Sequence, residues 1–220
     1  MISIVIPVWC EAALIAASVR AAAAVGDEVI VVDADSTDGT AGLAASSGAR
    51  VVQSARGRGR QLHAGALAAR GDVLLFLHAD ARLDSRARTA IDAALADERV
   101  VGGNFRIAYV PAQGAARIFT FLCDLRRRCM PVYYGDSAIF VRRTVYERIG
   151  GFRPMSIMED YEFIRRLERA GRTAYLRSVK VEVSSRRFRR APWRTLLLWT
   201  CIQWLYMLGV PSERLARLYK

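Results

Sequence analysis

The chain has 220 residues, of which 53% are hydrophobic and 25% are charged, and its formal net charge is +12. This composition excludes a disordered chain, and the length fits one domain with a large core. Arginine carries almost all of the positive charge, because Lys180 and Lys220 are the only lysines. The charge favours anionic partners, which include nucleic acid, phosphorylated small molecules and acidic membrane surfaces.

The four cysteines show no spacing typical of a metal site, so we expect reduced, partly buried thiols in a cytoplasmic protein. They are Cys10, Cys123, Cys129 and Cys201. Residues 1–7 contain no basic leader and no cleavage site. The apolar, β-branched run over residues 2–6 predicts a first strand that ends at Pro7, and not a signal peptide.

The first half of the chain alternates short apolar runs with helical patterns. Strands are predicted over residues 2–6, 29–32, 50–53 and 73–77, and helices over residues 11–24, 41–47 and 61–69. This alternation indicates βαβ units with right-handed crossovers, and therefore a mostly parallel sheet flanked by helices. The unbroken run over residues 73–77 suits a strand that is covered on both faces.

The second half contains longer elements. Helices are predicted over residues 84–96, 115–128 and 161–170, and strands over residues 99–110 and 138–141. Gly102 and Gly103 would let a backbone or a ligand approach the first of these strands closely. The helix over residues 115–128 has an apolar stripe that we assign to the core, namely Ile118, Phe119, Phe121, Leu122 and Leu125.

His78 and Asp80 follow the run over residues 73–77, at the carboxyl end of the predicted strand. In open α/β sheets ligands bind at that edge, where a carboxylate can hold a divalent cation beside a phosphate. The alternative is a helix cap, because Asp often stands where a helix begins. The spacing alone leaves both interpretations open.

Residues 56–60 read Arg-Gly-Arg-Gly-Arg and precede a predicted helix. Backbone N–H groups, guanidinium groups and the helix N-terminus suit such a loop to phosphate binding, and a solvated flexible loop is the alternative. The loop lacks the ending of a P-loop and the spacing of a dinucleotide fingerprint. Arg58, Arg60, Arg186 and Arg187 are therefore our candidates for contacts with phosphates.

Four segments together resemble the pattern of glycosyltransferase family 2. They are Ile4-Val-Ile-Pro-Val-Trp-Cys-Glu11, Val31-Val-Asp-Ala-Asp-Ser-Thr-Asp-Gly-Thr40, Phe76-Leu-His-Ala-Asp80, and Gly150-Gly-Phe followed by Met158-Glu-Asp160. The resemblance covers nearly the whole chain, and within the family the chain is most similar to the small bacterial radical-SAM/selenodomain-associated transferases.

The resemblance implies a GT-A fold, a nucleotide-diphosphate sugar donor with a UDP-sugar favoured, and inverting transfer. It places the donor nucleoside against Pro7, Glu11 and Asp33, with Asp35 beside them. It assigns Asp80 to the Mg²⁺ or Mn²⁺ ion that bridges the donor phosphates.

In the same family pattern, His78 stands where many relatives carry the first acid of an Asp-x-Asp motif. Asp160 matches the general base of the family, and Gly135, Asp136 and Glu159 are expected on the acceptor side. First-turn acids also stabilise a helix, so capping is the alternative role of Glu159 and Asp160.

The chain departs from the family pattern in two further places. Many relatives carry two adjacent acids after the second strand, whereas here Ala34 separates Asp33 from Asp35. The Gln-x-x-Arg-Trp motif of processive polymerising members is absent, and Ser184-Ser-Arg-Arg-Phe188 is only a faint analogue. This absence favours transfer of a single sugar.

Residues 195–210 are rich in Leu, Trp, Tyr and Met and follow a run of arginines that includes Arg189, Arg190 and Arg194. As a helix they would be about 24 Å long, whereas a membrane span needs about 30 Å. We expect an amphipathic helix that lies on anionic head groups, or one that docks on its own domain or on a second subunit.

We divide the chain into a GT-A domain over residues 1–190 and a C-terminal helical segment over residues 191–220. Within the domain, residues 1–100 form the expected nucleotide-binding half and residues 101–190 the acceptor half.

The sequence thus predicts a metal-dependent, inverting glycosyltransferase that moves one sugar to a small-molecule or lipid acceptor. The expected location is the cytoplasm, with the inner face of the cell membrane and a homodimer as open alternatives. A nucleotidyltransferase acting on a phosphorylated small molecule would release pyrophosphate instead. A non-catalytic module that binds membrane or nucleic acid would use the arginines alone, although we expect no nucleic-acid partner.

Overall fold

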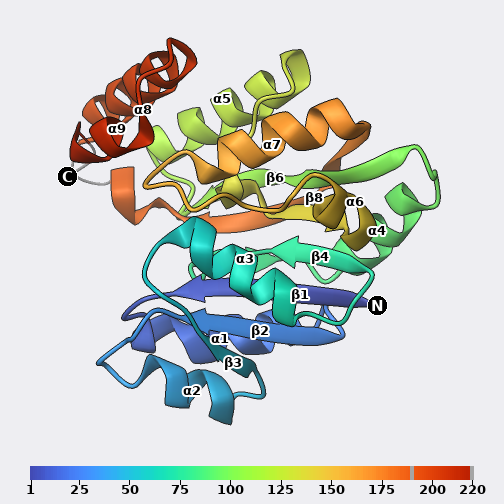
Figure 1. Cartoon of the computed structure of the whole chain (residues 1–220). Coiled ribbons are helices and arrows are strands. Elements are labelled where there is room, and N and C mark those ends of the chain that lie inside the picture. The colour runs from blue at the N-terminus through green and yellow to red at the C-terminus, as the bar shows by residue number, and fades with distance from the viewer. Residues whose placement is uncertain (189–190, 219–220) are drawn as a thin grey trace.

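The computed structural model describes residues 1–188 and 191–218, without the side chains of residues 187 and 188. Within these ranges the strands form one eight-stranded sheet in the order β3-β2-β1-β4-β7-β6-β8-β5, with helices on both faces (Figure 1). The strands are β1 (Ile2–Val8), β2 (Glu28–Asp33), β3 (Arg50–Gln53), β4 (Val73–Phe76), β5 (Ala81–Leu83), β6 (Val100–Val110), β7 (Ile139–Arg142) and β8 (Arg172–Ser184).

The helices alternate with the strands in the first half of the chain and gather in the second half. They are α1 (Ala12–Ala23), α2 (Thr40–Ser46), α3 (Arg58–Ala68), α4 (Ala87–Leu95), α5 (Ala115–Cys129), α6 (Arg143–Arg148), α7 (Glu159–Ala170), α8 (Pro192–Met207) and α9 (Ser212–Leu218). Two 3₁₀ turns, η1 (Gly135–Ser137) and η2 (Ser185–Phe188), lie near the carboxyl ends of the central strands. The predicted α/β class with a mostly parallel sheet is confirmed.

The parallel part of the sheet consists of β3, β2, β1 and β4. The prediction that the first strand ends at Pro7 is wrong, because β1 continues to Val8. The pairing of β1 with β4 stops at Val5 and Phe76, so the missing N–H of Pro7 removes no bond to that neighbour.

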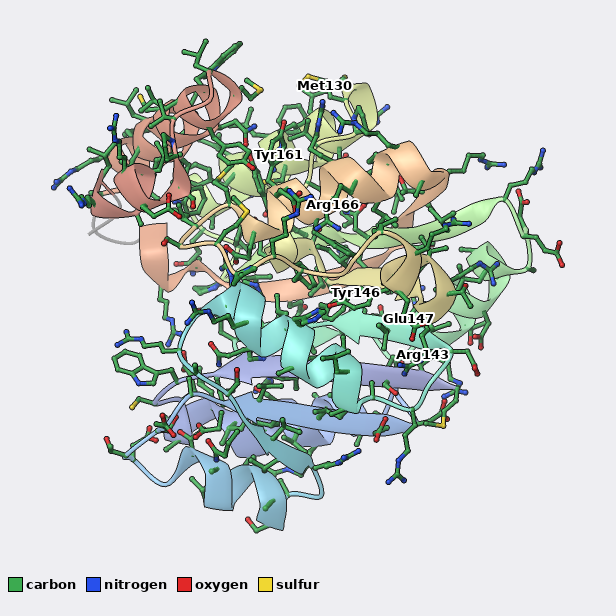
Figure 2. All side chains as sticks on the ribbon, in the orientation of Figure 1. Met130, Arg143, Tyr146, Glu147, Tyr161 and Arg166 are labelled. Carbon is green, nitrogen blue, oxygen red and sulfur yellow. The ribbon has the colours of Figure 1, made fainter. Side chains whose placement is uncertain are left out.

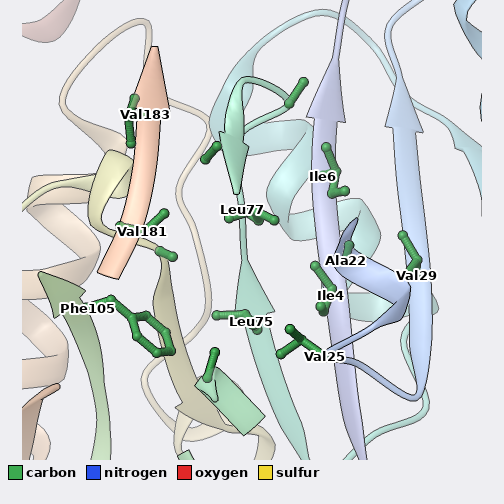
Figure 3. Close-up of a cluster of buried hydrophobic side chains, with 14 of the residues drawn as sticks. Ile4, Ile6, Ala22, Val25, Val29, Leu75, Leu77, Phe105, Val181 and Val183 are labelled. Atoms are coloured by element: carbon green, nitrogen blue, oxygen red, sulfur yellow. The ribbon is translucent and has the colours of Figure 1, made fainter. Parts of the chain in front are cut away.

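Apolar residues on both faces of these strands account for the unbroken runs in the sequence. Ile4, Ile6, Leu75 and Leu77 point to one cluster, which also contains side chains of α1, α4 and α5 (Figure 3). The alternate residues, among them Val5, point to a second cluster beneath α3, α6 and α7. Because helices cover both faces, these strands carry no polar face.

The second half of the sheet is mixed. β7 is antiparallel to β4 and β6, whereas the long strand β8, which the sequence analysis did not predict, is parallel to β6. A side-chain carbon on Gly102 would lie 2.4 Å from the Phe140 carbonyl oxygen, and one on Gly103 would lie 2.1 Å from that of Ala174. Neighbouring strands therefore make the close approach expected at these glycines.

The predicted core face of α5 is wrong in four of its five residues. Phe119 is buried, but Ile118, Phe121, Leu122 and Leu125 are exposed. The cysteine prediction also needs a correction, because all four thiols are free but only one, at Cys123, is partly buried. Apolar periodicity identified the stripe on α5, but it carries no information on whether another element covers that stripe.

The C-terminal helices pack on their own domain at the end of the sheet near α7. Ile202 on α8 and Leu215 on α9 are buried in a small cluster with Met158 and Tyr161. Tyr161 of α7 lies on the side toward α8 (Figure 2), and its ring centre is 5.9 Å from that of Tyr206. Docking on the same chain, one of the alternatives for this helix, thus accounts for one face of α8.

Candidate active site

The carboxyl ends of β1, β2 and β4 lie at the same edge of the sheet, because these three strands are parallel. The chain leaves β1 toward β2 on one side, and β4 lies on the other side of β1. This arrangement is the topological switch point at which open α/β sheets bind ligands. The loops after these strands carry most of the residues singled out in the sequence.

Asp33 ends β2 and is buried, with 1% of its surface exposed. Its Oδ2 accepts a hydrogen bond of 3.0 Å from the Ser36 N–H, whereas Oδ1 has no partner among the described residues. A buried carboxylate oxygen normally has a partner, so Oδ1 is available to a donor group of a ligand. The Gln61 side chain donates to the carbonyl oxygens of Val8 and Val32 and so ties α3 to the ends of β1 and β2.

The loop over residues 34–40 is fastened to the start of α1. The N–H of Cys10 donates to Ser36 Oγ at 2.8 Å, and the N–H of Glu11 donates to Thr40 Oγ1 at 2.9 Å. Asp35 is exposed in this loop. The first two motifs of the sequence thus form one connected rim beside Asp33.

Asp80 follows β4 and faces a guanidinium group. Arg186 Nη2 lies 3.7 Å from Asp80 Oδ2 and 3.6 Å from Glu11 Oε1. The Asp80 side chain is 11% exposed, so this carboxylate lies in a low-dielectric setting where a cation is attractive. η2 therefore brings an arginine to the two acids that the sequence assigns to the donor and the cation.

Asp160 opens α7 and is held from three sides. Its Oδ2 accepts a hydrogen bond of 2.8 Å from the Gly135 N–H, and its Oδ1 accepts one of 2.7 Å from the Tyr161 N–H. Arg58 Nη2 lies 3.8 Å from Oδ2, while Arg58 Nε donates to Glu159. The first turn of α3 and the first turn of α7 thus meet through one arginine and two acids.

Gly135 is the point at which the β4 motif and the α7 motif meet. A side-chain carbon at this position would lie 3.1 Å from His78 Nε2 and 3.2 Å from Asp160 Oδ2. A side-chain carbon at these distances would crowd both groups, so the glycine lets them lie close to the backbone. His78 and Asp160, which are 82 positions apart in the sequence, therefore belong to one site.

A small pocket lies between the sheet edge and the C-terminal part of the chain. It is lined by His78, Asp80 and Asp136 together with Tyr109, Ser184 and Trp199. The Tyr109 hydroxyl donates a hydrogen bond of 2.7 Å to Asp136. Burial, followed by the neighbouring Asp136 charge, raises the pKa of Tyr109 well above its usual value, so the phenol stays a donor.

Tyr109 and Trp199 are two of the pocket residues that the sequence did not predict. Tyr109 lies on β6 and Trp199 on α8, and both elements reach the pocket only through the tertiary fold. Neither residue belongs to a local motif, so the sequence offered no signal for either of them.

Backbone strain is concentrated around the site. Among the described residues, the non-glycine residues with positive φ are Cys10, Asp35, Ala138 and Met158. Each stands in or next to a segment that carries a candidate site residue, and such conformations persist only where the surrounding structure holds them.

Not every predicted residue reaches the centre of the site. Pro7 pairs with Val32 on β1, next to the strand end that carries Asp33. Arg60 is exposed on α3. The side chain of Arg187 lies outside the described part of the chain, and so do Arg189 and Arg190.

Within the described residues, no three side chains from His, Cys, Asp and Glu gather closely enough to hold a metal ion. One carboxylate nevertheless fits a cation that is shared with a diphosphate, because Mg²⁺ is commonly held by one or two carboxylates plus substrate phosphates. Asp80, which is largely buried and placed at the sheet edge, meets this requirement.

The comparisons with known proteins agree with this architecture. The family model described as Glycosyl transferase family 2 matches residues 3–156. No curated protein matches the chain. Glucosyl-3-phosphoglycerate synthase from Mycobacterium tuberculosis, in complex with Mn²⁺, UDP and glucosyl-3-phosphoglycerate, is 23% identical, with a TM-score of 0.62 over 96% of this chain and 81% of that chain.

Two further solved structures share the fold at low identity. S. aureus TarS is 16% identical, with a TM-score of 0.67 over 83% of this chain and 36% of that chain. A mycobacterial protein is 22% identical, with a TM-score of 0.56 over 84% of this chain and 65% of that chain. This chain therefore spans just under two thirds of the mycobacterial structure and about a third of TarS.

Proposed function

Because the chain belongs to glycosyltransferase family 2, we propose that it moves one sugar from a nucleotide-diphosphate sugar to an acceptor hydroxyl, with inversion and with help from a divalent cation. The observation that carries this proposal is the meeting of His78 and Asp160 at Gly135. This contact brings the segment after β4, which suits the donor phosphates, next to the Asp160 carboxylate, which suits the acceptor.

In the proposed reaction the donor nucleoside lies against Asp33, whose Oδ1 accepts a hydrogen bond from it. The donor phosphates lie toward Asp80 and Arg186. Asp80 would hold Mg²⁺ or Mn²⁺, which supplies Lewis-acid stabilisation of the charge that builds on the leaving diphosphate. Arg186 adds hydrogen bonds to the same oxygens.

Asp160 acts on the acceptor. It takes the proton of the acceptor hydroxyl while that oxygen bonds to the anomeric carbon, and the bond from this carbon to the phosphate oxygen breaks. The nucleoside diphosphate leaves with the electron pair of that bond. Gly135 and Tyr161 orient the Asp160 carboxylate, while Glu159 positions Arg58 beside it.

UDP is the nucleotide that we propose, and the M. tuberculosis structure holds UDP together with Mn²⁺. The acceptor is a small molecule or a lipid that enters between Asp136 and Trp199. The similarity to radical-SAM/selenodomain-associated transferases, a homodimer, a cytoplasmic location and the division at residues 100 and 190 remain predictions from the sequence.

A product assay tests the proposed function. The purified protein is incubated with UDP-glucose and other nucleotide sugars, with Mn²⁺, Mg²⁺ or EDTA, and the released nucleotide is identified. We expect nucleoside diphosphate in the presence of the cation and little in EDTA. Release of pyrophosphate would favour a nucleotidyltransferase, and no turnover of any nucleotide sugar would contradict the proposal.

A further inference from the structure

Two helices expose apolar stripes that the fold leaves uncovered. On α5 the stripe consists of Ile118, Phe121, Leu122 and Leu125, of which Phe121 is 63% exposed. On α8 it consists of Trp193, Leu197, Trp204 and Met207, and Leu197 is 65% exposed. The spacing of each set places its members on one face of its helix.

The helices α5 and α8 lie at the same end of the molecule (Figure 1), and the segment that follows α5 packs against α8. Met130, at the end of α5, is exposed (Figure 2), whereas Val132 and Tyr134 pack against the inner residues of α8. The Tyr134 hydroxyl donates to Gln203 of α8. α8 is thus anchored beside α5 by one face and leaves its other apolar face free for a partner.

Arginines surround these stripes. On α5, α8 and α9 the exposed arginines are Arg117, Arg128, Arg194, Arg214 and Arg217. Among the described residues of the three helices, Glu213 is the only exposed acid, because Asp124 is buried. An apolar centre with a cationic rim complements a surface that is apolar below a layer of negative charge.

We propose that the exposed faces of α5 and α8 form a docking surface for an anionic lipid bilayer. A second copy of the chain fits this surface less well, because a symmetric contact would set each arginine rim against its counterpart. The bilayer also accounts for Trp193 and Trp204, since tryptophan favours the boundary between head groups and hydrocarbon.

The docking is peripheral. Within the described ranges, no helix combines the length and the apolar character that a membrane crossing requires. Trp199, which lines the pocket, lies on the same helix as the exposed Trp193 and Trp204. Docking through α8 would therefore hold the mouth of the pocket close to the bilayer surface.

Sedimentation with vesicles tests this surface. The full chain is mixed with vesicles of phosphatidylcholine alone or of phosphatidylcholine with phosphatidylglycerol, and the pelleted fraction is measured at low and high salt. We expect pelleting with the anionic vesicles only, and a decrease at high salt. Replacing Arg117 and Arg194 by Gln should weaken the partitioning by on the order of tenfold.

The apolar contribution is tested on each helix separately. The double substitutions Phe121→Ser with Leu125→Ser, and Leu197→Ser with Trp204→Ser, should each lower the partitioning by about tenfold or more. Leu43→Ser with Leu67→Ser, on α2 and α3, is the matched control and should leave it unchanged. All of these side chains are exposed, so the variants should melt near the parental temperature.

Three results would overturn the proposal. One is the absence of pelleting with anionic vesicles, and another is equal pelleting of the helix variants and the parent. The third is a concentration-dependent dimer in the parent that the α5 or α8 substitutions abolish, because a second copy would then occupy the surface. None of these measurements depends on turnover, so a failure of the proposed transfer reaction would leave the docking surface standing.

Discussion

Asp160 is the residue on which the proposed chemistry depends most. Two backbone N–H groups fix its carboxylate, and Arg58 lies on the side of Oδ2. Asp160→Asn keeps the size of the side chain but cannot accept the acceptor proton. We expect transfer to fall by roughly 10²- to 10⁴-fold, with UDP still bound in the presence of Mn²⁺. Initial rates of UDP release and a binding titration measure the two quantities.

Glu159→Gln is the matched comparison, one position away on the same helix turn. Glu159 is 2% exposed and accepts from Arg58, so its loss should disturb the position of Arg58 without removing a proton acceptor. We expect a smaller loss of transfer than in Asp160→Asn. If Glu159→Gln were inactive and Asp160→Asn fully active, Asp160 would not be the general base.

At the scale of single elements, Gly59 lets the first turn of α3 reach α7. A side-chain carbon there would lie 2.3 Å from the Arg153 carbonyl oxygen. Gly59→Ala should therefore push Arg58 away from Glu159 and lower the free energy of unfolding by about 1–3 kcal/mol. Gly42→Ala on α2 meets no atom within 4 Å and should instead stabilise by about 0.5–1 kcal/mol. Urea unfolding of both variants, with rates of UDP release, decides whether the contact matters.

The docking of α8 on its own domain makes a second prediction at this scale. Ile202 is 3% exposed and packs with Met158 and Tyr161, so Ile202→Ala should cost about 2–4 kcal/mol. Leu197 on the outer face is 65% exposed, and Leu197→Ala should stay within about 0.5 kcal/mol of the parent. Thermal unfolding and limited proteolysis after residue 190 compare the two. Equal stability of both variants would mean that α8 is not docked as described.

The parallel half of the fold could be predicted because its strands are continuous apolar runs between helical patterns. β8 was missed, although Val179, Val181 and Val183 alternate with Lys180 and Glu182. That alternation is the pattern of a strand with one buried face, and it contains no unbroken apolar run. The sequence contained the signal for β8.

The site could be predicted only where its residues belong to motifs. Asp33, Asp80 and Asp160 follow or open predicted elements, and the structure places them near the same sheet edge. Tyr109 and Trp199 reach the pocket from β6 and α8, which meet it through long-range packing. Local periodicity carries no information on such packing, and the exposed stripe of α5 was assigned to the core for the same reason.

At the scale of the whole molecule, the sheet joins a parallel half, which carries Asp33 and Asp80, to a mixed half, which supplies Asp136, Asp160 and the arginine of η2. The two halves meet where β4 pairs with β7. The acids that we propose for the donor and its cation, and the acid that we propose for the acceptor, thus come from opposite sides of this junction. A cation and a nucleotide would bridge the junction, so their binding should stabilise the entire fold.

Calorimetric titration of UDP in Mn²⁺ and in EDTA measures whether Asp80 joins a cation to a nucleoside diphosphate at this sheet edge. We expect the parent to bind UDP tightly only with Mn²⁺. Asp80→Asn, folded and melting near the parental temperature, should lose this dependence, because an amide is a poor ligand for a hard cation. His78→Ala should lose less affinity. Equal UDP affinity of Asp80→Asn and the parent in Mn²⁺ would show that Asp80 does not hold the cation.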